Sequence, residues 1–198
     1  MCHATADADR MQIMRDGVTA SDYIAFLATV HGFEVPVALA LDATPGLGVW
    51  IAAARQEDGR AQLRRLRADL AALGVADPAD LPACPGISPF ASPATALGWL
   101  YVVERNTLVD GLVLRHLRPR LPAPLDRAGS YLARVERSAG ARWRELGAAL
   151  DRRARTARDG DAIIAAARAA FRCQHRWYQA PTVRIPLPSH AVHSAAAP

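Results

Sequence analysis

"ALGWLYVVERNTLVDGLVLRHL", residues 96–117, is apolar enough at helical spacing to form the most deeply buried helix of this chain. The same stretch carries four charged or amide side chains within seven residues, namely Glu104, Arg105, Asn106 and Asp110. Burying an unpaired charge costs several kcal/mol. These side chains are therefore expected either to meet partners or to line a cavity, and we look for function first at this helix.

Helical spacing continues on both sides of this segment. Thr19 and Asp22 form a variant of the capping box ahead of an apolar run over residues 23–41, and Pro36 is expected to kink that helix. Four further stretches repeat their apolar residues at helical intervals: residues 59–74, 126–137, 141–154 and 159–179. Strand-like alternation is nowhere sustained. The fold class is therefore expected to be all-α, a single-domain helical bundle.

A proline-rich connection precedes the central helix. Residues 75–93 contain five prolines in 19 residues, which predicts an irregular segment. The central helix is expected to run from about Pro93 or Thr95 to Leu117.

Length and composition fit one soluble domain. The chain has 198 residues, of which 51% are hydrophobic and 22% charged. We expect a helical domain over residues 1–179 and a flexible, Pro- and Ala-rich tail over residues 180–198.

Cys2, Cys84 and Cys173 show no metal-binding or disulfide spacing, which indicates a reducing compartment. No leader is recognisable and no stretch approaches the roughly 20 apolar residues that span a bilayer, so we expect a cytoplasmic protein without a membrane partner.

The net charge of +5 comes almost entirely from arginine. The arginines alternate with Asp, Glu and Ala at helical spacing, and aromatic residues make up only 6%, too few for a platform on which bases stack. We therefore expect solvated helix faces and no nucleic-acid partner. Sequence signatures of serine hydrolases, phosphate loops, dinucleotide-binding folds, zinc proteases and diiron bundles are absent from the chain.

The order of segments over about residues 3–178 resembles the bacterial heme oxygenase family, the biliverdin-producing type often associated with phytochromes. The most specific piece is "ALGWLYVVE", residues 96–104, which is similar to the start of that family's distal heme helix. The resemblance implies a heme sandwiched between a proximal helix, whose histidine binds iron, and this distal helix.

The distal helix departs from the family at the position where it would cross the heme. Relatives carry Gly-Ser-x-Leu-Gly-Gly there, because only glycine lets the backbone lie against a flat macrocycle. Here all three glycines are replaced, and Arg105 and Val109 project side chains that the family avoids. Asn106 falls where some relatives carry a polar residue that organises the distal water. The missing glycines argue against ordinary turnover.

The resemblance offers two alignments of the proximal helix. "HATAD", residues 3–7, matches a histidine followed four residues later by Asp, which would make His3 the axial iron ligand. "ATADAD" aligns equally well with the stretch before that histidine, and Asp9 then takes its place. Arg168 and Arg172 share a helix face and resemble the basic positions that hold the heme propionates.

Three functional readings follow. In the first, heme bound through His3 is opened to biliverdin, CO and iron, with O₂ and an external electron donor such as a ferredoxin or a reductase. In the second, the same fold serves a heme-independent enzyme on another small ligand, and Glu34, Arg105, Asn106 and Asp110 line the former heme cavity. In the third, a non-catalytic binding protein has its cavity filled by Arg105, paired with Asp110 or Glu104.

Overall fold

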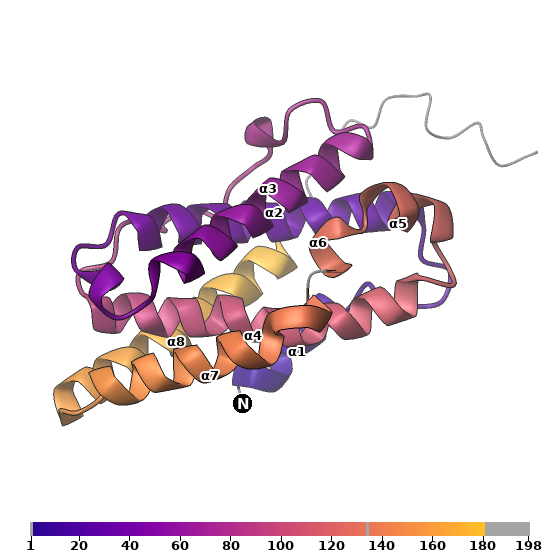
Figure 1. The fold of residues 1–198 in the computed structure, drawn as a ribbon. Helices are drawn as coiled ribbons and strands as arrows, with labels where there is room; N and C mark the ends of the chain where they lie inside the picture. Colours follow the sequence, from indigo (N-terminus) through magenta and orange to yellow (C-terminus); the bar gives the residue numbers. More distant parts are fainter. Residues whose placement is uncertain (1, 134, 181–198) are drawn as a thin grey trace, which may run out of the picture.

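The computed structural model describes the backbone of residues 2–133 and 135–180, and the side chains of these ranges except those of residues 2–6, 53–55 and 135–139. Within these ranges the chain forms α-helices and short 3₁₀ turns and no strand, which confirms the all-α prediction (Figure 1). The helices are α1 (Cys2–Met11), α2 (Ala20–Asp42), α3 (Ala53–Ala72), α4 (Pro93–Leu117), α5 (Pro122–Ala128), α6 (Ser130–Ala133), α7 (Val135–Arg153) and α8 (Ala157–Gln179), with 3₁₀ turns η1 (Leu47–Val49) and η2 (Pro78–Asp80). The expected tail, residues 180–198, falls outside the described residues apart from Ala180.

Capping residues begin α2 and α4 as their sequences indicate. The Thr19 hydroxyl accepts from the Asp22 backbone N–H at 3.2 Å, and the Asp22 carboxylate accepts from the Thr19 N–H at 2.8 Å. The α2 helix then continues through Pro36 to Asp42. Ser92 caps α4 through the Thr95 N–H at 3.2 Å, with Pro93 in the first turn, where its missing N–H costs no hydrogen bond. The expected limits of the central helix are confirmed.

The α2 helix corrects one expectation. By length and composition it is the one helix, among those the structure describes, that could cross a membrane, although the sequence had indicated no such stretch. More than half of its apolar window, 56%, is nevertheless buried inside the protein. His31 and Glu34 within it are buried as well. This burial is typical of the core helix of a globular bundle.

The α4 helix lies at the centre of the bundle, in contact with α1, α2, α6, α7 and α8 (Figure 1). It packs closely against α8 at Gly98, where an added Cβ atom would lie 2.5 Å from the Ile163 carbonyl oxygen. On another side, Val109 and Val113 of α4 join an apolar cluster with α2 and α3. The central helix is therefore enclosed by neighbouring helices on several sides.

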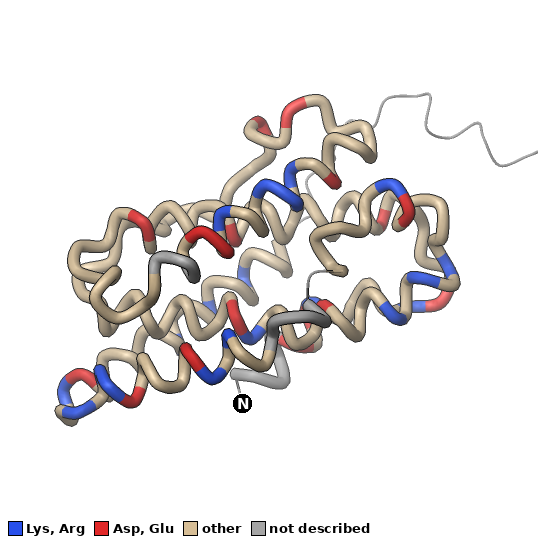
Figure 2. The backbone as a smooth tube through the Cα atoms, viewed as in Figure 1, with Lys and Arg blue, Asp and Glu red and all other residues tan. Residues whose placement is uncertain are grey.

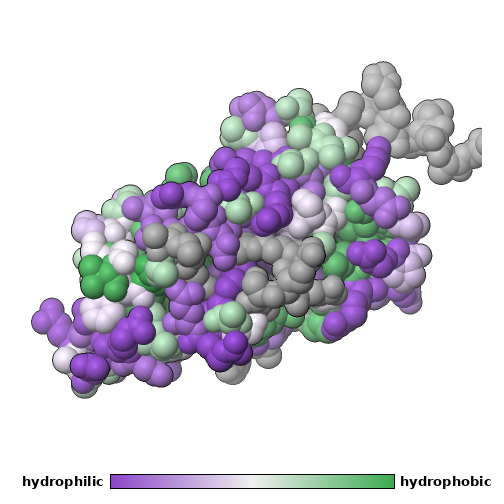
Figure 3. All heavy atoms as spheres, in the orientation of Figure 1, coloured by the Kyte–Doolittle hydropathy of each residue, from purple (hydrophilic) through white to green (hydrophobic). Residues whose placement is uncertain are grey.

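The outer surfaces match the expected solvated faces. Basic and acidic residues are interspersed along α3 and α7 (Figure 2). The face seen in Figure 3 is mostly hydrophilic over these helices, with smaller hydrophobic patches near both ends of the molecule. Several arginines of α3, α7 and α8 are exposed, among them Arg64, Arg144 and Arg176.

Candidate functional site

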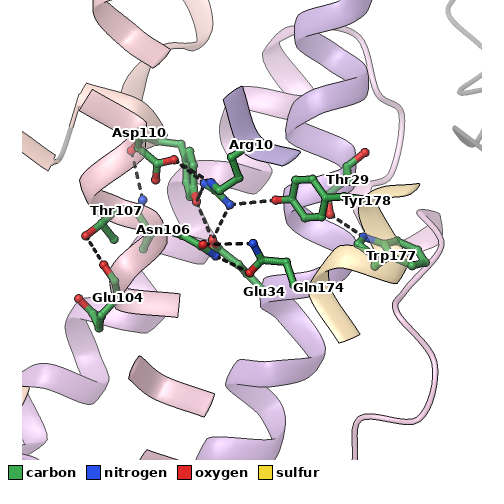
Figure 4. A network of polar contacts seen from close by, with 12 residues as sticks. Arg10, Thr29, Glu34, Glu104, Asn106, Thr107, Asp110, Gln174, Trp177 and Tyr178 are labelled. Carbon is green, nitrogen blue, oxygen red and sulfur yellow. Dashed lines mark hydrogen bonds and ion pairs between the residues drawn. The ribbon is translucent and has the colours of Figure 1, made fainter. Parts of the chain in front are cut away.

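A buried arginine of α1 lies at the meeting point of the polar side chains (Figure 4). Arg10 is only 1% exposed, and its Nε atom donates to Asp110 Oδ1 on α4 at 3.2 Å. Its Nη2 atom donates to the same oxygen and to Tyr131 Oη at 3.2 Å. Its Nη1 atom donates to Tyr178 Oη at 2.9 Å and, more weakly, to Glu34 Oε1 at 3.4 Å. We call Arg10, Glu34, Asp110, Tyr131 and Tyr178 the arginine junction; it ties α1 to α2, α4, α6 and α8.

The short α6 helix holds Tyr131 in the junction. The Tyr131 backbone N–H and the Ser130 hydroxyl each donate to the Asp69 carboxylate of α3 at 2.7 Å. The Gln62 side chain of the same helix donates to the Tyr131 carbonyl at 3.1 Å. Burial raises the pKa of the Tyr131 phenol, which therefore stays protonated and donates to Glu34 Oε1 at 2.9 Å. A fixed hydroxyl thus points at a buried carboxylate.

Two carboxylates share one guanidinium in this junction. Burial raises the pKa of Glu34 to about 7, against the opposing influence of Arg10. Burial also raises the pKa of Asp110, again opposed by Arg10. Asp110 makes the closer contact with the guanidinium, through two nitrogens. Glu34, whose pKa lies at about 7, therefore changes protonation near neutral pH.

A cleft, which we call the central cavity, opens beside the junction between α2, α3, α4 and α7. Its empty volume, including the space at the open mouth, is about 770 Å³. Glu34 and Tyr131 belong both to the junction and to the lining of the cavity. The apolar part of the lining includes Val37, Leu41, Leu63, Leu100 and Val103. The cavity thus combines apolar walls with a carboxyl group that titrates near pH 7.

The other charges of the lining are paired. Arg142 of α7 donates from Nη2 to both carboxylate oxygens of Glu104 on α4 at 2.7 Å, and both residues are buried. Nearer to solvent, Arg60 donates to Asp42 at 3.1 Å, with both side chains more than a third exposed. Glu34 is the carboxyl group of the lining that belongs to neither of these pairs, and burial raises its pKa to about 7.

The polar side chains of α4 meet partners on three other helices. Besides the Asp110 and Glu104 pairs, Arg105 donates to Asp7 of α1 at 2.6 Å. Asn106 exchanges two amide hydrogen bonds with Gln174 of α8, at 3.0 and 3.2 Å. Of the four residues predicted to line a cavity together, only Glu34 lies on the central cavity; Arg105, Asn106 and Asp110 are absent from its lining. Their proposed catalytic roles stay predictions.

The residues predicted to hold heme belong to three helices, α1, α4 and α8. Val109 is buried in the apolar cluster shared with α2 and α3. Arg168 and Arg172 are exposed on α8. His3 lies in α1, but its side chain is outside the described part of the structure, so the iron-ligand prediction stays untested. Asp9, the alternative at that position, is buried and accepts from His175 Nδ1 and Gln179 Nε2 on α8, each at 2.8 Å.

The space between α1 and α4 does not fit a heme over the residues described. Asp7 binds Arg105 and Arg10 binds Asp110, so the facing side chains of the two helices touch directly. Arg10 and Asp110 are 1% and 0% exposed, which shows that solvent does not reach between them either. A macrocycle would have to break both ion pairs. Among the described residues there is also no group of three His, Cys, Asp or Glu side chains that could hold a metal ion.

The arginines that pair with Asp110 and Glu104 are ones that the sequence did not single out. Arg10 is a lone arginine in a short helix, and Arg142 is one of several arginines in α7, so neither carries a local signal. The sequence did carry one signal, which is that charged residues, Glu104 and Asp110, interrupt an apolar helix. It indicated that partners exist but not which residues supply them.

Comparison with known proteins gives one match. A family model described as heme oxygenase matches residues 64–180, more than half of the chain. No curated protein and no solved structure matches the chain. The matched range includes α4, α7, α8 and the distal positions 105–110. It leaves out α1 and α2, which carry Arg10 and Glu34.

Proposed function

The chain belongs to the heme oxygenase family, and we propose that it uses the fold of that family to bind a small ligand other than heme in the central cavity. One observation carries this proposal: Arg10 occupies the space between α1 and α4 while an open cavity lies beside it. In this proposal the family's helices are retained, and the binding site has moved.

The lining indicates the chemistry of the ligand. Apolar side chains of α2, α3 and α4 favour a small and mostly apolar body. The ion pairs Glu104–Arg142 and Asp42–Arg60 are neutral as units, so they supply hydrogen bonds without a strong preference for either charge. Glu34 is the group suited to a polar atom of the ligand that gives or takes a proton near pH 7.

The arginine junction would orient Glu34 for that exchange. Its Oε1 atom receives hydrogen bonds from Tyr131 and Arg10, which fixes the carboxyl plane. Both donors stabilise the ionised form, while burial stabilises the neutral form, and the balance leaves the pKa at about 7. A ligand atom bound beside Glu34 can therefore meet either an acid or a base at physiological pH.

A second candidate is favoured by the family match itself. It is the oxidative opening of heme to biliverdin with release of CO and iron, supported by an external electron donor such as a ferredoxin or a reductase. In this candidate His3 would bind iron, and Arg168 and Arg172 would hold the propionates. It requires Arg10 and Asp110 to separate, at the cost of two buried charges left without each other.

Titration with hemin distinguishes the two candidates. We expect no sharp Soret band, and no band that shifts on adding CO, because the ion pairs of Arg10 and Arg105 occupy the space between α1 and α4. The measurement is the absorption spectrum of purified protein mixed with stoichiometric hemin. A sharp band that responds to CO and disappears in His3→Ala would support heme turnover and contradict our proposal.

Filling the central cavity should abolish binding of small ligands. In a thermal-shift screen of small amphiphilic acids, amines and carbonyl compounds, we expect hits that raise the melting temperature of the wild-type protein and have no effect on Ala38→Trp. Ala38 lines the cavity, and an indole there removes much of its volume. The matched control is Leu39→Trp on the next residue of α2, which is 65% exposed and should keep every hit. Hits that stabilise Ala38→Trp equally would place the binding site elsewhere.

A further inference from the structure

Two cysteines that are 89 positions apart in the sequence lie side by side in the fold. The Sγ atoms of Cys84 and Cys173 are 3.4 Å apart. Cys84 belongs to the irregular segment between η2 and α4, and Cys173 to α8. We propose that this pair is a dithiol site that small disulfides oxidise to an internal disulfide bond, in which Cys173 attacks and Cys84 resolves. The inference is independent of the proposed function.

The geometry allows the bond to close with a small movement. A disulfide has an S–S length of about 2.05 Å, so the two sulfurs must approach by somewhat more than about 1 Å. Cys173 is held on a long helix, whereas Cys84 lies between Pro82 and Pro85 in a segment without helical hydrogen bonds. The Cys84 backbone N–H donates to the Gly32 carbonyl of α2 at 2.7 Å, which keeps the thiol facing α8. Because Cys173 is held by the hydrogen bonds of α8, we expect Cys84 to make most of the movement.

The two sulfurs have different surroundings. Cys84 is 6% exposed and packs against Phe33 and Val37, whereas Cys173 is partly open to solvent. A hydrogen bond from the Cys84 thiol lowers the pKa of Cys173 to about 7, and the Arg176 guanidinium contributes to the lowering. The same hydrogen bond and burial raise the pKa of Cys84. The accessible sulfur is thus the better nucleophile, and the buried one is poised to react second.

The reaction balances without a metal or a further oxidant. Cys173 loses its proton, and its thiolate attacks one sulfur of a small disulfide, forms a mixed disulfide and releases the first small thiolate, which takes up a proton. Cys84 loses its proton, attacks the Cys173 sulfur and releases the second small thiolate, which takes up a proton. The protein is oxidised by two electrons to the Cys84–Cys173 disulfide, and the small disulfide is reduced to two thiols.

The bond would fasten the irregular segment to α8. The apolar cluster around Cys84 includes Val37, Leu41 and Val103, which also line the central cavity. Joining residues so far apart in sequence restricts the unfolded chain, so the oxidised protein should melt several degrees higher than the reduced one. The oxidation state of the pair is therefore expected to set the rigidity of one cavity wall.

The test is to incubate the folded, reduced full-length protein with oxidised glutathione and to follow it by intact mass and peptide mapping. We expect a final product two hydrogens lighter than the reduced protein, with Cys84 linked to Cys173 in one peptide pair and a higher melting temperature. Cys84→Ser should stop at the mixed disulfide, with glutathione on Cys173. Cys2→Ser, which removes the third cysteine, should form the internal bond as fast as the wild-type protein.

Two results would overturn the proposal. One is a wild-type protein that ends with glutathione on Cys173 and no internal bond. The other is a wild-type protein whose Cys84 and Cys173 stay reduced or pair with Cys2. Both results are read on the wild-type chain, so they remain decisive even where a serine variant folds poorly.

Discussion

Replacing Arg10 with methionine is expected to lower the free energy of unfolding by about 3–5 kcal/mol. The substitution keeps most of the side-chain volume but leaves Asp110 and Glu34 buried without their guanidinium. It also removes hydrogen bonds to Tyr131 and Tyr178. Urea unfolding followed by circular dichroism at pH 7.5 measures the loss.

Two further variants test whether the loss of stability comes from leaving buried carboxylates without a partner. Arg15→Met removes another arginine bound to a carboxylate, Asp22, but its side chain is 59% exposed, so we expect a loss of about 1 kcal/mol or less. The double variant Arg10→Met with Asp110→Leu should recover much of the stability of the wild-type protein, because an apolar pair replaces a buried ion pair at little cost. An Arg10→Met protein as stable as Arg15→Met would show that the junction contributes little.

Glu34→Gln should flatten the dependence of stability on pH. Burial raises the pKa of Glu34 from 4.5 to about 7 in the folded protein. Between these values the folded state holds a proton that the unfolded state has released. The neutral carboxyl group of Glu34 therefore stabilises the folded protein by up to about 3 kcal/mol. This stabilisation is fully present below about pH 4.5 and is lost as the pH rises through about 7. The amide of glutamine cannot titrate, so the variant should lack this part of the slope.

The measurement is a series of urea unfolding curves between pH 4.5 and pH 8. Asp110 also has a raised pKa and contributes a slope of the same sign, so the difference between wild type and Glu34→Gln isolates Glu34. Glu57→Gln is the matched control, because Glu57 is exposed on α3 and its pKa is lowered by Arg64. If Glu34→Gln keeps the full slope of the wild-type protein, Glu34 does not titrate in this range.

Much of the fold could be predicted from local patterns. The capping pair Thr19 and Asp22, and the interval from Pro93 to Leu117, marked helices whose limits the structure confirms. These features depend on residues within a few positions of each other, which is the range over which capping and apolar periodicity act. The heme oxygenase resemblance is also confirmed at the level of the family. Its bacterial, phytochrome-associated type and its chemistry stay predictions.

The candidate site was only partly predictable. Glu34 was singled out because it is a carboxylate in an apolar run, and it does line the central cavity. The suggestion that Arg105 pairs with Asp110 or Glu104 differs from the structure, in which Arg105 binds Asp7, Arg10 binds Asp110 and Arg142 binds Glu104. A chain with 24 basic residues offers many partners for each buried acid, and spacing along one helix does not choose among them.

By itself the sequence determined that this chain is a helical bundle, because the burial of an apolar stripe follows from the order of residue types. It also determined that the charges of the central helix need partners, because the cost of removing a charge from water depends on residue type alone. Only the tertiary structure decided that the partner of Asp110 is an arginine 100 positions before it, and that Glu34 remains beside an open cavity. The choice depends on which residues of different helices meet in space. That meeting is fixed by packing across the whole bundle, which no local stretch of sequence encodes.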